Sequence, residues 1–276
     1  MSNNVNVRVA LVTGASSGIG QAAAKALAKA GFKVYGTSRR PSKVVSAEQI
    51  PYEMLTLDVT SDASVDAAVE EVIRLAGRID VLVNNAGFGV APGGAEESSI
   101  DQAKSIFETN FFGVMRMTRA VLPHMRKQGN GRIINIGSVV GFLPMPYGAV
   151  YSASKHAIEG YSESLDHELR TRGIRVSVIE PAYTKTQFDA NFLEPDSPLD
   201  EYREERSNLN KKMKVLLEKG DDPSVVAEVV LQVAQATNPR LNYTAGARAA
   251  QLRLLRRYAP SSAMDAGLRK DFGLAD

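Results

Sequence analysis

The sequence predicts an α/β protein in which one doubly wound parallel β-sheet lies between two layers of helices. Strand-like and helix-like segments alternate as far as residue 244. The strand-like segments are continuous Val, Ile and Leu runs rather than alternating patterns, which indicates a sheet buried on both faces. Right-handed crossovers between such strands produce a three-layer, doubly wound domain. The 276 residues are enough for one large domain, so we predict a single catalytic domain over residues 1–276.

Seven segments have the composition of strands. Each is rich in β-branched and other apolar residues, and each ends in, or is soon followed by, Gly, Pro, Asn or Ser. In chain order the predicted strands are residues 5–13, 33–39, 54–59, 79–87, 132–138, 174–181 and 240–244.

The segments between these strands have the features of helices. Residues 21–30 are rich in Ala and end before Gly31, and residues 62–77 combine an acidic start, apolar residues at helical spacing and a terminal Gly. The remaining predicted helices are residues 100–110, 113–128, 151–171 and 223–236.

Two segments lie outside this alternation. Residues 184–222 are charged, contain Pro and are predicted to be irregular; a long connection in a compact α/β domain is usually a lid or binding loop, with a solvated excursion as the alternative. Residues 245–276 are predicted to be a helical extension. Its basic, amphipathic stretch 251–258 could lie on a membrane surface, although a solvated helix packed on the domain fits better.

Composition excludes several classes of function. The 33 Lys and Arg against 31 Asp and Glu give a net charge of +2, so no overall field attracts nucleic acid or anionic lipid. The absence of Cys excludes thiolate chemistry, and three scattered His argue against a zinc site. No apolar run approaches the roughly 20 residues of a membrane span, and the N-terminus does not resemble a signal peptide. We expect a cytoplasmic protein that acts on a small molecule without a bound metal.

A Gly-rich turn follows the first strand. In TGASSGIG, Gly14 permits a tight turn, Gly18 allows backbone to approach a pyrophosphate, and the helix beginning near Ile19 directs its N–H groups at that anion. A purely structural turn is the alternative, but the position between the first strand and the first helix favours dinucleotide binding.

The end of the second strand bears on which dinucleotide is bound. An acidic residue there would bind the 2′-hydroxyl of NAD, whereas this chain has Ser38, Arg39 and Arg40. An Arg binds a 2′-phosphate that a carboxylate would repel. These residues therefore favour NADP(H) over NAD(H), unless the arginines are simply solvated.

Polar residues also follow the third and fourth strands. Asp58 and Val59 end the third, and Asn84-Asn85-Ala86-Gly87 ends the fourth, at the sheet edge where open α/β sheets bind ligands. Asp58 could contact adenine or could cap the helix that follows Thr60; the sequence favours neither.

A phenol and an ammonium share one face of the predicted helix 151–171, because Tyr151 and Lys155 are four residues apart. A free phenol has a pKa of about 10, so acid–base work near neutral pH needs nearby positive charge, which Lys155 would supply. Ser138, at the end of the fifth strand, is placed to hold a carbonyl oxygen. Without the other motifs, the pair would be read as a surface contact.

Together, TGASSGIG, NNAG, Asn110, Ser138 and YSASK resemble the short-chain dehydrogenase/reductase family, over about residues 7–186. The resemblance implies a Rossmann-type domain and NAD(P)-linked hydride transfer at a carbonyl or alcohol. It implies that Tyr151 is the general acid/base, that Lys155 holds the nicotinamide ribose and lowers the Tyr151 pKa, and that Ser138 orients the substrate oxygen. Asn110 would support a water relay behind Lys155.

The resemblance also implies a set of cofactor contacts. Asn84 and Gly87 match the family's turn beside the cofactor, and Thr184 matches a threonine that touches the carboxamide. The family usually has Pro-Gly where this chain has Pro181-Ala182, which affects how closely backbone passes the nicotinamide. The full predicted set is Gly14, Ser16, Ser17, Gly18, Ile19, Gly20, Ser38, Arg39, Asp58, Val59, Asn85, Ala86, Gly87, Asn110, Tyr151, Lys155, Pro181 and Thr184.

Residues beyond 186 resemble, more weakly, the 17β-hydroxysteroid-dehydrogenase-like branch. The family resemblance also implies a homodimer or homotetramer, paired through helices 113–128 and 151–171. We expect an NADP(H)-dependent carbonyl reductase or alcohol dehydrogenase for a mostly apolar substrate, enclosed by residues 88–90, 139–147 and 184–222. The last segment would contribute Phe188, Phe192 and Leu193. A non-catalytic dinucleotide sensor, or an epimerase or dehydratase that retains its cofactor, is the alternative.

Overall fold

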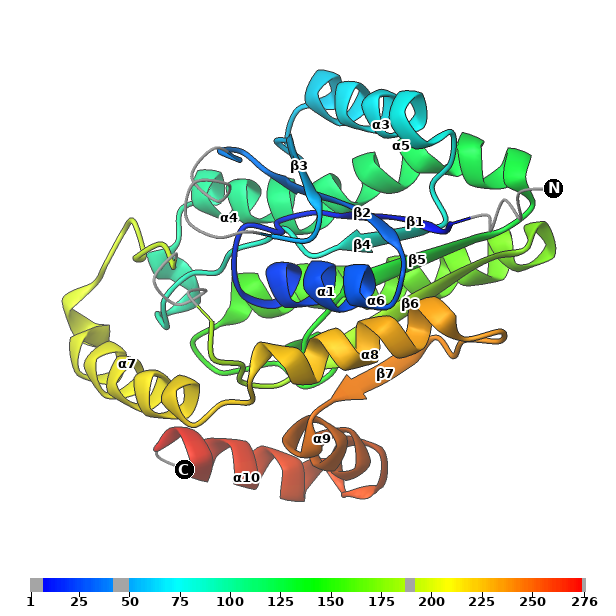
Figure 1. The fold of residues 1–276 in the computed structure, drawn as a ribbon. Helices are drawn as coiled ribbons and strands as arrows, with labels where there is room; N and C mark the ends of the chain where they lie inside the picture. Colours follow the sequence, from blue (N-terminus) through cyan, green and yellow to red (C-terminus); the bar gives the residue numbers. More distant parts are fainter. Residues whose placement is uncertain (1–6, 42–49, 187–191, 275–276) are drawn as a thin grey trace, which may run out of the picture.

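Seven parallel strands form one sheet in the order β3-β2-β1-β4-β5-β6-β7 (Figure 1). The structure is a computed structural model and describes residues 7–41, 50–186 and 192–274. From β1, the sheet continues through β2 to β3 on one side and through β4, β5 and β6 to β7 on the other. This order confirms the doubly wound fold. The strands are β1 (Val9–Val12), β2 (Lys33–Ser38), β3 (Glu53–Thr56), β4 (Val81–Asn84), β5 (Gly131–Ile136), β6 (Ile174–Pro181) and β7 (Asn242–Ala245).

Helices cover both faces of the sheet and create two apolar cores. In β1, Ala10 and Val12 contribute to one core, and Val9 and Leu11 to the other. Both faces of each central strand are therefore dry, which explains the continuous apolar runs. One face carries α1 (Gly18–Lys29) and α8 (Pro223–Gln235), and the other carries α3 (Asp62–Ala76), α5 (Gly113–Gln128) and α6 (Ala149–Leu169).

Two predicted helices, 100–110 and 113–128, are joined without a break. Helix α4 (Ile100–Phe107) continues through a π-helical turn, η2 (Glu108–Phe112), directly into α5. The two predicted ranges left only residues 111 and 112 between them, and in the structure those residues complete the π turn. Such turns inside helices often occur at functional sites.

The prediction that residues 184–222 are irregular is wrong in part. They contain a short 3₁₀ turn, η6 (Asp200–Tyr202), and helix α7 (Arg203–Glu218). Helix α7 buries only Leu209 and Met213, so its apolar stripe is too narrow to stand out in a charged sequence. The two ends of the segment lie side by side, because Lys185 N donates to Asp221 O at 2.8 Å.

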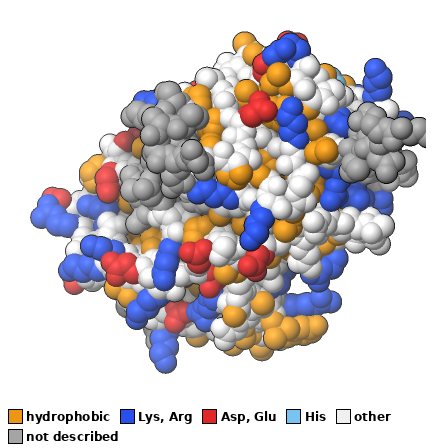
Figure 2. Space-filling view, in the orientation of Figure 1, with side chains coloured by type: hydrophobic (Ala, Val, Ile, Leu, Met, Phe, Trp, Pro, Cys, Tyr) orange, Lys and Arg blue, Asp and Glu red, His pale blue; other side chains and the backbone are white. Residues whose placement is uncertain are grey.

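The C-terminal residues form α9 (Ala247–Tyr258) and α10 (Ser261–Phe272), which lie with α7 beyond α8, along the lower side of Figure 1. On the face shown in Figure 2, Lys and Arg side chains are mixed with Asp and Glu, in keeping with the small net charge. In the described part of the chain, no helix is both long and apolar enough to cross a membrane.

Candidate active site

The Gly-rich turn has a backbone that glycine makes possible. Gly14 and Gly18 have φ of +65° and +54°, in the left-handed region, and a Cβ on Gly20 would lie 2.3 Å from the Gly14 carbonyl oxygen. Ser17 precedes α1 and makes no capping hydrogen bond from its side chain. The first N–H groups of α1 are therefore left to an anion, so the turn fits a dinucleotide pyrophosphate.

Hydrogen bonds between the ends of β1 and β4 hold this turn in place. Asn85 Nδ2 donates to the carbonyl oxygens of Thr13, at 3.0 Å, and Gly14, at 3.1 Å. Thr13 Oγ1 accepts from the backbone N–H groups of Asn85, at 2.9 Å, and Ala86, at 3.0 Å. Asn85 thus has a bracing role in addition to the contact predicted for it, and sequence reasoning missed Thr13.

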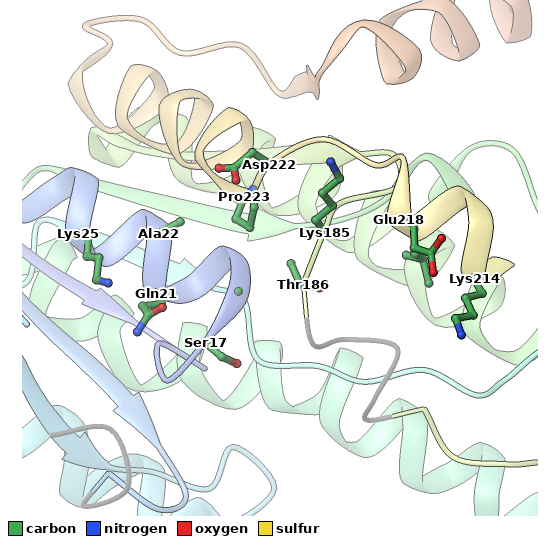
Figure 3. Close-up of a pocket in the computed structure, with 12 residues that line it drawn as sticks. Ser17, Gln21, Ala22, Lys25, Lys185, Thr186, Lys214, Glu218, Asp222 and Pro223 are labelled. Carbon is green, nitrogen blue, oxygen red and sulfur yellow. The ribbon is translucent and has the colours of Figure 1, made fainter. Parts of the chain in front are cut away.

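A hollow of about 650 Å³ opens beside the turn (Figure 3). Three lysines, Lys25, Lys185 and Lys214, line it together with two acidic residues. Thr186 lies close to the turn, since a Cβ on Gly18 would be 3.1 Å from its Cβ. The complete lining is Ser17, Gly18, Gln21, Ala22, Lys25, Lys185, Thr186, Lys214, Leu217, Glu218, Asp222 and Pro223.

At the end of β2, Arg39 is exposed and Ser38 Oγ accepts from Arg40 N at 3.0 Å. Asp58 Oδ1 accepts from Thr60 N at 3.0 Å and from Thr60 Oγ1 at 2.8 Å. Those hydrogen bonds, and secondarily the charge of Arg39, lower the pKa of Asp58. Ser61 caps α3, so Asp58 forms the turn before the helix rather than its cap.

The three predicted catalytic side chains come together at the end of β5. Tyr151 and Lys155 are one turn apart on α6, and Lys155 Nζ is 5.8 Å from the centre of the Tyr151 ring. Lys155 Nζ donates to Ile136 O at 2.9 Å. Ser138 follows directly after β5, and its side chain hydrogen-bonds to Tyr151.

Burial governs the charge of this group. It raises the pKa of Tyr151 above its ordinary value, and the Ser138 hydrogen bond opposes that rise. The expected lowering of this pKa by Lys155 is not found: burial raises it, and Ser138 is the group that opposes the rise. Burial lowers the pKa of Lys155 to about 8, with Glu159 acting against that change. Near neutral pH, Tyr151 is therefore a proton donor beside an ammonium.

Asn110 is buried in the π turn η2 and joins two parts of the site. Its Oδ1 accepts from Phe88 N at 3.0 Å, and its Nδ2 donates to Phe88 O at 2.9 Å. The same Nδ2 donates to Ser154 Oγ at 3.2 Å, on the helix that carries Tyr151 and Lys155. Asn110 therefore positions the chain after β4 against α6.

Only some of the side chains predicted to line the substrate pocket are exposed enough to contact a substrate. Val139 and Leu143 are buried, at 9% and 7% exposure, whereas Phe142 and Tyr147 are half-buried. Tyr147 has φ of +58°, uncommon for a residue with a side chain. Its ring lies 6.1 Å from that of Tyr202 in η6. Phe188 lies outside the described residues.

The predicted lid is tied to the chain after β4 by a buried carboxylate. Glu97 is fully buried and accepts from Gly94 N and Leu199 N, both at 2.7 Å. It also pairs with Arg206 of α7. A second link lies before α7, where Val90 and Leu193 form an isolated parallel β-bridge. Sequence reasoning missed this anchor.

Sequence reasoning also missed an acidic pair between α6 and β6, formed by half-buried Glu159 and fully buried Glu180. Both had a signal in the sequence. Glu159 is four residues after Lys155 and so shares its face of the helix. Glu180 lies in the sixth strand directly after Val178 and Ile179, where a buried charged residue needs a specific partner.

Comparison with known proteins agrees with this geometry. Residues 8–196 match the short chain dehydrogenase family. The chain is 47% identical over 185 residues to a 3-ketodihydrosphingosine reductase of Bacteroides thetaiotaomicron, covering 67% of this chain and 66% of that protein. It is 37% identical over 253 residues to human 17-beta-hydroxysteroid dehydrogenase type 1, covering 85% of this chain and 76% of that protein.

Solved structures show the same fold. A short-chain dehydrogenase from Streptomyces avermitilis superposes with a TM-score of 0.80 at 32% identity, covering 98% of this chain and 97% of that one. A 3-ketoacyl-(acyl-carrier-protein) reductase from Brucella melitensis with NADH has a TM-score of 0.73 at 30% identity, covering 88% and 98%. A metagenomic short-chain oxidoreductase with NADP has a TM-score of 0.66 at 29% identity, covering 86% and 96%.

Proposed function

Since this chain belongs to the short-chain dehydrogenase family, whose members are NAD(P)-binding oxidoreductases, we propose that it is an NADP(H)-dependent enzyme that interconverts a carbonyl and an alcohol on a mostly apolar small molecule. The observation that carries this proposal is the convergence of Ser138, Tyr151 and Lys155 at the end of β5. A protein that only bound a dinucleotide would not need a half-buried phenol and a buried ammonium beside the site.

The chain's own residues have separable tasks in this proposal. Ser138 holds the substrate oxygen, and Tyr151 donates a proton to that oxygen during reduction or takes one from it during oxidation. The Lys155 ammonium would favour the phenolate and would hold the nicotinamide ribose. Because burial raises the pKa of Tyr151, the neutral phenol predominates, which favours carbonyl reduction near neutral pH.

The cofactor would bind along the ends of the strands. The N-terminus of α1 and the glycines of its turn would hold the pyrophosphate, Asn85 would keep that turn in shape, and Thr184 would contact the carboxamide. When bound, the nicotinamide supplies or accepts the hydride that the protein has no group to carry.

A carbonyl and alcohol panel tests the proposal. We expect oxidation of NADPH, followed by its absorbance, with apolar ketones and stoichiometric formation of alcohol. Turnover of substrate without net consumption of cofactor would instead indicate an epimerase or dehydratase. Cofactor binding without turnover of any compound would indicate a sensor.

We expect Arg39→Ala to weaken NADPH binding by roughly ten- to a hundredfold, from a loss of about 1.5–3 kcal/mol, while NADH binding hardly changes. The reason is that exposed Arg39, at the end of β2, would pair with the 2′-phosphate. Dissociation constants from nucleotide fluorescence provide the measurement.

Arg40→Ala is the matched control, since it removes the neighbouring exposed guanidinium. If the loss followed Arg40 instead, the phosphate contact would be reassigned to that residue. A preference of the unsubstituted protein for NADH would contradict the NADP(H) proposal altogether.

The proposed substrate is a ring-containing or long-chain ketone or alcohol. Half-buried Phe142, Met145 and Tyr147 follow the strand that ends at Ser138, and drying such surface contributes roughly 25 cal/mol per Å². The relatives named for 3-ketodihydrosphingosine and for 17-beta-hydroxysteroid support this substrate class.

Phe142→Ala is expected to raise the KM for large apolar ketones several-fold more than the KM for the smallest one, because only the large compounds reach that wall. The measurement is kcat/KM over matched ketones of increasing hydrophobicity, with a charged, sugar-like ketone as the comparison. A clear preference for the sugar-like ketone would contradict the apolar pocket.

We also propose a homodimer or homotetramer paired through α5 and α6, in the cytoplasm. Phe112, 43% exposed, supports this pairing because its ring meets Phe111, which in turn meets Tyr161 of α6. Light scattering of the unsubstituted protein and of Phe112→Asp would detect such a pairing.

A further inference from the structure

A partly buried polar network joins the catalytic helix to the C-terminal helix α9. Asn242 Nδ2, in β7, donates to Glu159 Oε2 and to Glu180 Oε1, both at 2.9 Å. Arg253 Nη1, in α9, lies 3.1 Å from the same Glu180 oxygen. One amide therefore bridges two carboxylates, and one guanidinium from the extension completes the chain of contacts.

The first end of this network lies directly beneath the Ser138 turn. A Cβ on Gly137 or on Gly141, which flank that turn, would lie 3.0 Å from Glu159 Oε1. The carboxyl group thus fills the space that those glycines leave open, one helical turn after Lys155. A shift of Glu159 would therefore change the packing beneath Ser138 and the surroundings of Lys155.

The second end reaches the substrate wall. The Arg253 guanidinium lies 4.7 Å from the centre of the Phe142 ring, a distance suited to a cation–π contact. Arg253 therefore makes two contacts at once: an ion pair with fully buried Glu180, and a stacking contact with an aromatic side chain of the proposed pocket.

The network is too costly to be incidental. Glu159 Oε1 and Glu180 Oε2 are buried without a hydrogen-bond partner in the part of the chain that the structure describes. Two carboxylates so close repel each other, and burial with this repulsion raises the pKa of Glu159 to about 8. Strongly perturbed pKa values cluster at functional sites, which makes this acidic pair a candidate for such a site.

We propose that Arg253 is a positioning residue of the active site, and that Glu180, Asn242 and Glu159 transmit its position to the Ser138 turn and to Lys155. The C-terminal extension is then part of the catalytic unit rather than an appendage. This inference rests on the proposed function, because it assigns Ser138 and Lys155 their roles.

The charges that face Glu159 determine its effect on Lys155. They are Lys155 on its own helix, Glu180 on β6 and Arg253 on α9; Asn242 on β7 is uncharged. An ionised Glu159 raises the pKa of Lys155 and so keeps the ammonium to higher pH. Because the pKa of Glu159 is also about 8, its carboxylate forms over the pH range in which Lys155 loses its proton. Removing this acid should therefore move the alkaline loss of activity to lower pH.

The first test compares two arginines of α9. Arg253→Met should raise the KM for large apolar ketones by roughly three- to tenfold, the size of a lost cation–π contact, and should speed amide hydrogen exchange in α9. Arg253→Lys should recover part of both effects. Arg256→Met, which removes an exposed charge from the same helix, should change neither. Equal behaviour of the two Met variants would overturn the proposal.

Arg253→Met also leaves Glu180 buried beside no cation, so the variant is expected to lose stability. The double variant Arg253→Met/Glu180→Gln removes both charges and should recover much of the Tm. If Arg253 positions the active site, the KM of this double variant should stay raised even though its Tm recovers. Recovery of KM together with Tm would show that Arg253 has only a structural role.

The second test uses the pH profile of kcat. Glu159→Gln should shift the alkaline limb of carbonyl reduction to lower pH by about half to one unit, because Lys155 loses its nearby negative charge. Glu163→Gln, an exposed acid on the same helix, is the matched control and should cause no shift. An unchanged limb in Glu159→Gln would overturn the link to Lys155.

The outcomes separate this inference from the proposed function. If Tyr151→Phe leaves turnover intact, the proposed function fails whatever Arg253 does. If Tyr151→Phe abolishes turnover while Arg253→Met behaves as Arg256→Met does, only the positioning role fails.

Discussion

Tyr151→Phe is expected to lower kcat for carbonyl reduction by about 10²–10⁴-fold, the contribution typical of a positioned general acid. The substitution removes one oxygen and its proton, and the ring can remain where it is. Dinucleotide affinity should stay within a few-fold, because the Gly-rich turn and the α1 N-terminus are unchanged. Steady-state kinetics together with nucleotide fluorescence separate the two effects.

Tyr161→Phe is the matched control for this loss. Tyr161 is on the same helix, ten residues later, and packs against Phe111 rather than facing Ser138. Its substitution should leave kcat close to that of the unsubstituted enzyme. Substantial turnover by Tyr151→Phe would show that another group protonates the substrate, and the proposed mechanism would have to be abandoned.

Lys155→Met should lower kcat by about 10²-fold or more and also weaken dinucleotide binding, in contrast to the Tyr151 variant. The ammonium is expected both to favour the phenolate and to hold the ribose. The substitution also leaves the Ile136 carbonyl oxygen without the donor at 2.9 Å, which should cost roughly 1–3 kcal/mol of stability. Thermal unfolding without cofactor measures that cost separately.

The pH dependence has a definite sign. Lys155 is charged below its pKa of about 8 and neutral above it, so carbonyl reduction should fall as the pH rises through about 8. Lys155→Met should lose this limb along with most of its activity. Lys25→Met, which alters the hollow beside α1 but not the catalytic helix, should retain the limb. If Lys155→Met kept the same fall in activity near pH 8, the titration behind that fall would belong to another group.

Much of the site could be predicted because it is encoded locally. A positive φ at Gly14 and Gly18 is a property of the residue type, and an i, i+4 relation on a helix places Tyr151 beside Lys155 without further information. The carboxyl ends of parallel strands meet at one edge, so Ser138 and Asn85 could be assigned to that edge before any coordinates were known.

Other features depend on contacts between residues far apart in the sequence. Helix α7 has only a narrow apolar stripe, and Glu97, 109 residues from Arg206, anchors it by an ion pair that no local pattern predicts. Asp58 was predicted either to contact adenine or to cap a helix, and the structure rules out the cap, because Ser61 caps α3 while Asp58 accepts hydrogen bonds from Thr60.

The sequence by itself determined the order of the seven strands, the Gly-rich turn and the candidate catalytic groups, since each depends on local conformation or on apolar period. Only the tertiary structure decided which buried charges meet. Glu159, Glu180 and Arg253 are on three different elements, and Asn242 on a fourth links them. The cost of burying a charge depends on what surrounds it in space, which no local pattern records.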